Sequence, residues 1–344
     1  MNLFDPIVPP DRQHPNFQQA LLRLGGGELD VIQGWAEGFE DRDGKLVKEF
    51  QTTFNSTFWE VYLHGLFKDY RHEVDWSHAR PDFWLKTKHG EVLVEAVTAN
   101  AAQDGQVEWA KKNGFDEDIA NKNFWPLNRE AIIRLSNSIT FKSKKYMEEY
   151  RGLAHATGKP FVIAVAPFEQ PYFQYQYDRA IRALLYDIYV DETAHHKNPN
   201  AYPNGAPDVN LGFVKKDSGA KIDLGIFLDD RLSHVSAVLF SCVGTWGKAI
   251  AMSEKPRLGT IQSMWGVGEY GQPTMRMMPI GVPSEGISDG IQIFHNPMAE
   301  FALPREVFRR QGVVQHFKTD RAWDFEGKDR CLMLRLPQTF ELTK

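Results

Sequence analysis

Three acidic residues in one stretch of the chain have the types and spacing to hold a divalent cation. Glu60 lies in a helical pattern, Asp82 follows Pro81 at the start of an apolar run, and Glu95 lies inside the run Val92–Val97. A carboxylate inside an apolar strand is costly to desolvate unless a partner compensates, and a bound cation is one such partner. Magnesium takes oxygen ligands, commonly one or two carboxylates with water and substrate phosphate. We therefore expect these acids to form a magnesium site.

The segments around the acids show both helical and strand-like patterns. Apolar residues recur at helical spacing from about Phe54 to Tyr70, which predicts a helix carrying the first acid. Residues 82–86 and 91–98 predict two strands joined by a tight turn. The separation of Asp82 and Glu95, 95 − 82 = 13, suits neighbouring strands. The two carboxylates are then close enough to share one ion.

The remaining pattern predicts an α/β fold with a mixed central sheet flanked by helices. A long helix from about Arg129 to Tyr150 precedes the continuously apolar run Phe161–Ala166, which is typical of a buried central strand. A helix between strands implies a crossover. Residues 99–128 are polar and predict an insertion or a loop over the site.

The expected organisation has three parts. Residues 1–48 form an N-terminal helical segment, 49–168 the core and 169–344 a β-rich C-terminal extension for recognition. In the last part we expect helices at 177–190 and 305–310 and strands at 222–228, 234–241, 274–280, 291–294 and 332–336.

Composition narrows the class of protein. The 344 residues are 42% hydrophobic and 25% charged, which predicts a sizeable core, and no apolar run approaches the roughly 20 residues that cross a bilayer. Cys242 and Cys331 are far apart in sequence and are expected to be inert thiols in a reducing compartment, hence a cytoplasmic location. The net charge of −5 disfavours coating of nucleic acid by bulk charge but allows a local basic face.

Over residues 50–168 the motifs resemble the PD-(D/E)XK nuclease superfamily, which includes many type II restriction enzymes and phage-type exonucleases. The resemblance rests on Pro81-Asp82, on Glu95-Ala96-Val97 in the next strand, and on a preceding helix with Glu60. It implies a core in the order helix, three-stranded meander, helix, strand.

The resemblance also implies roles for individual residues. Asp82 and Glu95 would bind Mg²⁺, with Mn²⁺ able to replace it, and the Ala96 carbonyl would be a further ligand. Glu60 would bind directly, through water or at a second metal.

The sequence departs from the family pattern at one position. The pattern has a lysine two residues after the glutamate, where this chain has Val97. Several superfamily members supply the lysine from the following helix, and Lys142 is the corresponding candidate, with Lys145 one turn on as the alternate. The resemblance implies that this lysine stabilises charge on the phosphorus and orients the attacking water. If neither lysine reaches the site, the enzyme is impaired or the fold is reused for binding.

The expected function is therefore that of a magnesium-dependent endonuclease in restriction or anti-phage defence. Its partner would be nucleic acid, DNA ahead of RNA and with no membrane, and it would work as a homodimer or within a defence complex. The first alternative is a catalytically inactive nuclease-fold module that binds nucleic acid or a partner. The second is a different metal hydrolase that uses the same acids. A buried salt bridge is the competing explanation for Glu95, a solvent-facing helix acid for Glu60 and a turn residue for Asp82.

Three further patterns bear on nucleic-acid binding. The aromatic residues between 168 and 177 could stack on splayed bases, and basic residues at 305, 309, 310, 318 and 321 could face phosphates. The segment from Gly244 to Ala249 hints at a phosphate loop, but its spacing is too short and Ala249 replaces the metal-binding hydroxyl, so we reject that interpretation.

Overall fold

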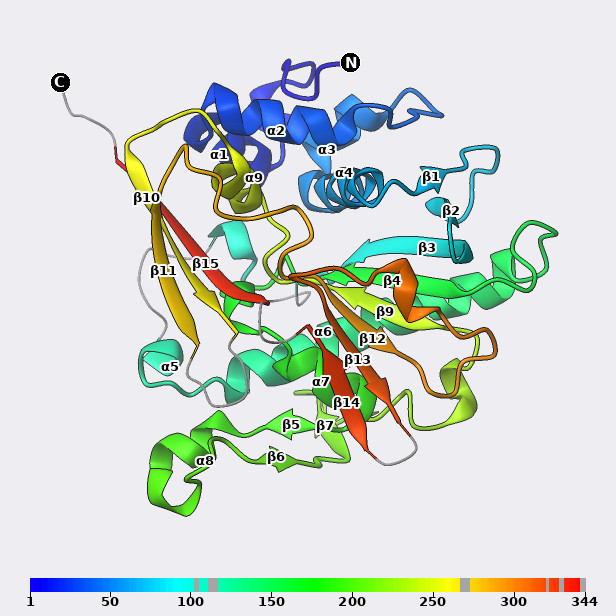
Figure 1. Cartoon of the computed structure of the whole chain (residues 1–344), viewed down its shortest axis with the longest axis vertical. Coiled ribbons are helices and arrows are strands. Elements are labelled where there is room, and N and C mark those ends of the chain that lie inside the picture. Colours follow the sequence, from blue (N-terminus) through cyan, green and yellow to red (C-terminus); the bar gives the residue numbers. More distant parts are fainter. Residues whose placement is uncertain (102–104, 111–116, 267–272, 320–321, 328–330, 341–344) are drawn as a thin grey trace.

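The chain folds around one large mixed sheet, as the computed structural model in Figure 1 shows. The structure describes residues 1–101, 105–110, 117–266, 273–319, 322–327 and 331–340. Within them the sheet has the strand order β1-β2-β3-β4-β9-β12-β13-β14. These strands are β1 (Glu73–Val74), β2 (Phe83–Thr87), β3 (Gly90–Thr98), β4 (Phe161–Ala166), β9 (Ala237–Phe240), β12 (Gln292–His295), β13 (Val314–Lys318) and β14 (Trp323–Glu326).

The strand directions change across this sheet. Strands β1, β2 and β3 form an antiparallel meander, and β3, β4 and β9 run parallel. Strand β12 is antiparallel to β9, β13 is parallel to β12, and β14 is antiparallel to β13. All six residues of β4 are buried, as its continuous apolar run predicts. The expected mixed central sheet is confirmed.

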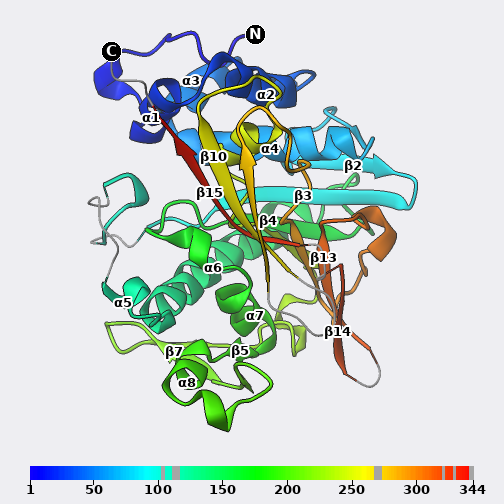
Figure 2. The ribbon, with the colours of Figure 1, turned by 60° about the vertical axis from the view of Figure 1, so that its left-hand side comes forward.

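Helices cover both faces of the sheet. They are α1 (Pro15–Arg23), α2 (Gly26–Ala36), α3 (Leu46–Thr52), α4 (Phe54–Asp69), α6 (Trp125–Lys145), α7 (Arg179–Tyr186) and α9 (Gly247–Met252). Figures 1 and 2 show α1–α4 and α9 on one face and α6 and α7 on the other. Helix α4 is anchored to the sheet because the Trp59 indole N–H donates to the Ala164 carbonyl at 3.0 Å. None of the described helices has the length and apolarity to cross a bilayer.

Smaller elements complete the structure. Strands β10 (Gly259–Trp265), β11 (Thr274–Pro279) and β15 (Leu332–Thr339) form a second sheet in the order β11-β10-β15. Two hairpins and two short helices are added: β5 (Tyr189–Val190) with β6 (Asp208–Val209), β7 (Phe213–Lys215) with β8 (Lys221–Asp223), α5 (Glu117–Ala120) and α8 (Glu192–Lys197). One hydrophobic core includes residues from all three predicted segments, and the boundary predicted after residue 48 falls inside α3.

Several predicted elements differ from the structure. The helix expected at 177–190 is the shorter α7, because Asp187 adopts a left-handed conformation with φ 54° and its carboxylate accepts the N–H groups of Leu211 and Gly212. The strand expected at 222–228 ends in β8 at Asp223. Strand β14 was not expected because only four residues, Trp323–Glu326, alternate between apolar and acidic side chains, and none of them is buried.

The insertion expected at 99–128 is described only in part. Residues 102–104 and 111–116 lie outside the described residues. The others include a 3-10 turn at Glu108–Ala110 and the short helix α5.

Candidate active site

Asp82 and Glu95 lie side by side where β2 begins beside β3. The backbone N–H of Asp82 donates to Glu95 Oε2 over 3.4 Å, and the backbone N–H of Ala96 donates to Asp82 Oδ2 over 2.8 Å. In an extended strand the N–H and C=O groups of one residue point to the same side. The Ala96 carbonyl therefore points to the side on which Asp82 lies.

Glu95 is 1% exposed, and its other carboxylate oxygen accepts three side-chain hydrogen bonds. Oε1 lies 2.7 Å from Lys142 Nζ, 3.3 Å from Lys145 Nζ and 3.2 Å from the Tyr150 hydroxyl. The two lysines come from α6, and Tyr150 comes from the turn that follows it. Both candidate lysines thus reach the strand glutamate.

A π-helical turn at Tyr146–Tyr150 explains how Tyr150 reaches the same carboxylate. In a regular α-helix Glu149, seven residues after Lys142, would share its face. The wider turn adds a residue, and the Arg151 N–H bonds to the Tyr146 carbonyl over 2.9 Å. Tyr150 then faces Glu95, while Glu149 pairs with Arg80. Sequence reasoning missed Tyr150 because a regular helical period does not place it there.

Glu60 belongs to the same electrostatic cluster, although it lies on α4. Burial, and then the charge of Asp82, raises the pKa of Glu60 to about 8. Burial, and then the charge of Glu95, raises the pKa of Asp82 to about 6. The charge of Lys142 lowers both values but does not cancel these effects. The charge of Lys142 therefore acts on all three carboxyl groups, and that of Lys145 acts on Asp82 and Glu95.

The three acids do not form a three-ligand metal cluster in the structure. Within the described ranges, no group of three or more His, Cys, Asp and Glu side chains could hold a metal ion. The helix with Glu60 covers the face of the sheet opposite α6, whose lysines contact Glu95. The expected convergence of all three acids on one ion is thus not seen.

The available donors nevertheless fit a hard divalent cation. Asp82, Glu95 and the Ala96 carbonyl provide oxygen atoms only, the ligand type that magnesium prefers. Burial first, and then the neighbouring acids, raise the pKa values of Glu60 and Asp82, so their ionised forms are unfavourable here. A cation beside them would favour their ionised forms.

Most residues of the other patterns expected to bind nucleic acid make internal contacts. Of the five aromatic residues between 168 and 177, Phe168, Phe173 and Tyr177 are buried and cannot stack on bases, whereas Tyr172 and Tyr175 are half-buried. Arg305 and Arg309 pair with Glu326. Arg310 pairs with Asp69. Residue 321 lies outside the described residues.

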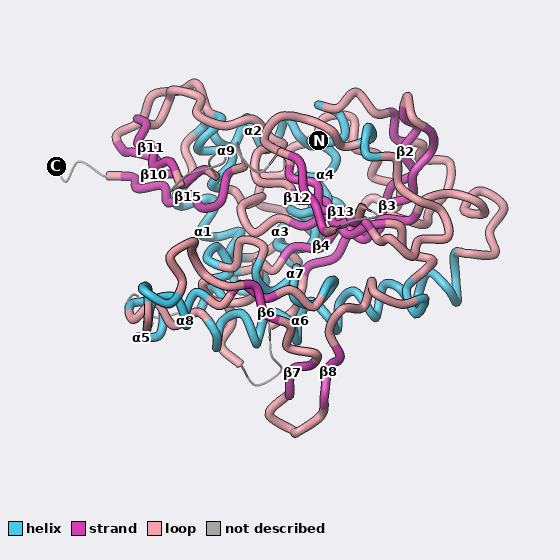
Figure 3. The backbone as a smooth tube through the Cα atoms, turned by 60° about the horizontal axis from the view of Figure 1, so that its bottom comes forward, coloured by secondary structure: helices cyan, strands magenta, loops and turns pink. Residues whose placement is uncertain are grey.

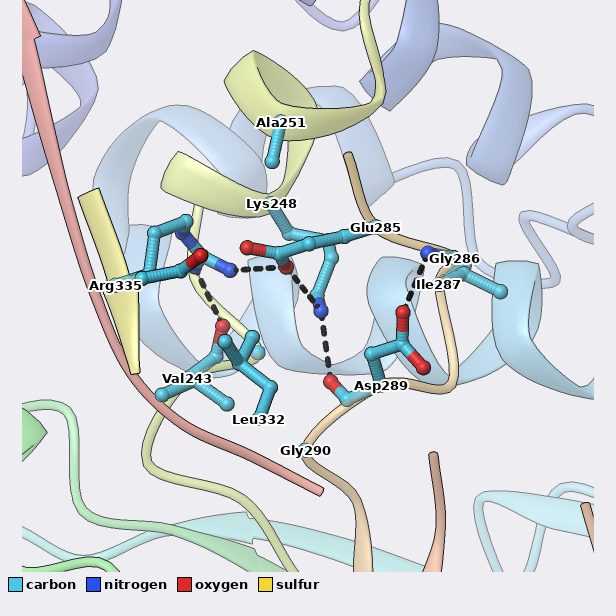
Figure 4. A network of polar contacts seen from close by, with 12 residues as sticks. Val243, Lys248, Ala251, Glu285, Gly286, Ile287, Asp289, Gly290, Leu332 and Arg335 are labelled. Carbon is cyan, nitrogen blue, oxygen red and sulfur yellow. Dashed lines mark hydrogen bonds and ion pairs between the residues drawn. The ribbon is translucent and has the colours of Figure 1, made fainter. Parts of the chain in front are cut away.

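A second charged cluster lies entirely inside the protein (Figure 4). Lys248 Nζ donates to Glu285 Oε2 over 2.6 Å and to the Asp289 carbonyl over 2.7 Å. Arg335 donates to the same Glu285 oxygen over 2.7 Å. Burial lowers the pKa of Lys248, whose side chain is fully buried. This lysine joins α9 to the 285–289 segment and is not presented to a phosphate.

Comparison of the chain with protein-family models, with curated proteins and with solved structures finds no match in any of the three.

Proposed function

We propose that the chain is a metal-dependent nuclease that hydrolyses phosphodiester bonds at a centre formed by Asp82, Glu95 and Lys142. The observation that carries the proposal is that Asp82 and Lys142 meet at Glu95. The Asp82 N–H lies 3.4 Å from one carboxylate oxygen and Lys142 Nζ lies 2.7 Å from the other. The contact of Lys142 with Glu95 supports the proposal that this lysine, from the helix after the meander, takes the role of the one absent at Val97.

The order of elements gives further support. Helix α4, the meander β1–β3, helix α6 and strand β4 follow one another, and β4 is parallel to β3. This is the order of the PD-(D/E)XK core that the motifs resemble. Under the proposal, residues 49–168 are a restriction endonuclease-like core.

A purely structural ion pair between Glu95 and the lysines would not require the two neighbouring acids. Glu60 and Asp82 both have raised pKa values in this cluster, so their negative charges are unfavourable there. Groups with pKa values shifted by burial and by a neighbouring charge are concentrated at functional sites. The surplus of acids therefore favours a site for a cation over a structural salt bridge.

In this site each residue has a distinct task. Asp82, Glu95 and the Ala96 carbonyl would hold Mg²⁺ or Mn²⁺, which when bound would polarise the phosphodiester and lower the pKa of water. The Lys142 ammonium stabilises negative charge that develops on the phosphoryl oxygens. Tyr150 orients the Glu95 carboxylate through the 3.2 Å hydrogen bond. The Glu60 carboxyl, with its pKa of about 8, can hold a proton near neutral pH.

The second candidate is a catalytically inactive nuclease-fold module that binds nucleic acid or a partner. One observation favours it: three donors already satisfy Glu95 Oε1. A role in restriction or anti-phage defence, with DNA as the preferred substrate, rests on fold-level analogy alone.

The test is cleavage of plasmid, single-stranded DNA and RNA in Mg²⁺ or Mn²⁺. Asp82→Asn and Glu95→Gln keep the side-chain shape and remove the charge, so both should abolish cleavage. Glu148→Gln is the matched control, because Glu148 is on the turn after α6 with its side chain 61% exposed. Cleavage that survives Asp82→Asn contradicts the proposal. Binding of nucleic acid without any cleavage supports the inactive module instead.

A further inference from the structure

A groove lies on both sides of Phe141 on helix α6. Two cavities of about 610 and 650 Å³ share Asn137 and Phe141 in their walls. The first lies between α6 and the end of β3, and the second between α6 and the β7–β8 hairpin. Figure 3 shows this hairpin next to the long helix, and the Arg129 guanidinium donates to the Lys215 carbonyl to hold them together. We call the two cavities together the Phe141 groove.

The groove is adjacent to the proposed catalytic centre. Val97 lines it and lies two residues beyond Glu95 on the same face of β3, about 6.6 Å along the strand. Ser138 also lines it and lies four residues before Lys142, about 6 Å along the helix. Because α6 connects the parallel strands β3 and β4, it runs back along the sheet. Both displacements therefore lead in the same direction from the Glu95–Lys142 pair.

The groove is positive, although the whole chain has a net charge of −5. Its walls contain five basic side chains and one acidic side chain: Arg134, Lys144, Lys216, Lys221 and Arg231, with Asp223. Three of the basic side chains pair with acids, Arg134 with Glu130, Lys144 with Glu148, and Arg231 with Asp229, so the positive charge of the groove comes from Lys216 and Lys221. Two lysines of the β7–β8 hairpin contact neutral groups: Lys216 Nζ lies 3.3 Å from Asn137 Oδ1, and Lys221 Nζ lies 4.3 Å from the centre of the Phe213 ring. Their charges are thus available to an anionic ligand such as a chain of phosphates.

Exposed aromatic rings accompany these charges. Phe141, which both cavities share, is 64% exposed, and Phe213 is 40% exposed. A positive groove with exposed aromatic side chains is the arrangement that binds single strands, because each base can stack on a ring while the lysines contact the backbone. The bases of an intact duplex are already stacked and cannot use Phe141.

We propose that the Phe141 groove binds single-stranded nucleic acid and leads it to the Glu95–Lys142 pair. One base stacks on Phe141, and the adjoining phosphates contact Lys216 and Lys221. The delivery of the strand for cleavage rests on the proposed nuclease function, whereas binding in the groove does not.

Binding can be measured apart from chemistry by fluorescence anisotropy in EDTA, with labelled DNA and RNA strands of about 12 nucleotides and a hairpin duplex. The full-length chain should bind the single strands more tightly than the duplex. Phe141→Ala should weaken single-strand binding by about 5- to 150-fold, the effect of one lost base–ring stack, and leave duplex binding unchanged. Replacing Lys216 and Lys221 together by Ala should lower the slope of log K against log salt by about 1.4.

The controls remove equivalent groups elsewhere on the surface. Phe340→Ala removes another exposed phenylalanine, and the pair Lys45→Ala and Lys255→Ala removes the same total charge from exposed positions. These variants should bind as the unchanged chain does. Equal losses in the control pair, or tighter binding of the duplex, would overturn the inference.

The two proposals fail in different ways. If the groove variants lose single-strand binding but no substrate is cleaved, the groove assignment holds and the nuclease proposal fails. If cleavage occurs and Phe141→Ala changes neither binding nor cleavage of single strands, the nuclease proposal holds and the groove assignment fails. The DNA and RNA strands in the same assay identify which polymer the groove prefers.

Discussion

Replacing Glu60 by glutamine is expected to stabilise the metal-free protein at neutral pH. The pKa of Glu60 is raised from its ordinary value of 4.5 to about 8, first by burial and then by the charge of Asp82. Between these pH values the folded chain holds a proton at Glu60 that the unfolded chain has released. The free energy of unfolding therefore falls as the pH rises from about 4.5 to about 8. Glutamine does not titrate, so the variant lacks this loss.

The size of the effect follows from the same pKa. One proton bound only in the folded state changes the free energy of unfolding by about 1.36 kcal/mol for each pH unit. At pH 7, roughly 2.5 pH units above the ordinary pKa, the loss reaches roughly 3 kcal/mol. Because Glu60 is half-buried, water screens its charge and reduces this loss of stability. We expect the variant to gain about 1 to 3 kcal/mol at this pH.

The assay is urea unfolding of both chains in EDTA from about pH 5 to about pH 8. The gap in stability between Glu60→Gln and the unchanged chain should widen as the pH rises. The control substitution Glu148→Gln, at an exposed position, should change the free energy of unfolding by almost nothing at every pH in this range. Adding Mg²⁺ should narrow the Glu60→Gln gap, because a cation held by Asp82 and Glu95 lowers the pKa of the nearby Glu60 and so removes part of its cost in the unchanged chain. A gap that stays constant with pH would refute the reasoning.

Three other changes test separate parts of the structure. Lys142→Met should lower the cleavage rate by about 10² to 10³, the effect of losing one preorganised charge donor, whereas Lys48→Met at an exposed position on α3 should retain cleavage; equal rates in both variants would contradict the role. Glu285→Ala leaves Lys248 buried without its acid and should cost about 3 to 5 kcal/mol in urea unfolding; a loss below about 1 kcal/mol would mean that the cluster relaxes. Gly290→Ala should lower the thermal midpoint, because φ is +84° and the new Cβ would lie 2.2 Å from a side-chain atom; an unchanged midpoint would show that the turn adjusts.

Local pattern was sufficient for the hairpin that brings Asp82 and Glu95 together. Strands were expected at 82–86 and 91–98, and the structure has them at Phe83–Thr87 and Gly90–Thr98. The antiparallel register pairs Phe83 with Val94, so the residue before the first strand lies beside Glu95. Register in a tight hairpin follows from turn length and side-chain alternation, and neighbouring residues along the chain determine both.

Patterns of charged and aromatic residues in the sequence predicted the nucleic-acid-binding residues much less well. The basic residues near 305–310 resemble a phosphate-binding patch in sequence, but acids from β14 and α4 pair with them. Conversely, Lys216 and Lys221 attract no notice in sequence and lie in a positive groove beside Phe141. Whether a charge is available to a ligand depends on its neighbours in space, and those neighbours are distant along the chain.

The sequence by itself determined the elements: the mixed α/β class, the buried strand β4, and the hairpin that joins two acids. Such features arise from periodicity and turn chemistry among nearby residues. Only the tertiary structure decided that Lys142, Lys145 and Tyr150 reach one oxygen of Glu95 and that, within the described residues, Glu60, Asp82 and Glu95 form no three-ligand metal group. These contacts depend on how helices pack on a sheet and on one π-helical turn, which the spacing of residues along the chain does not specify.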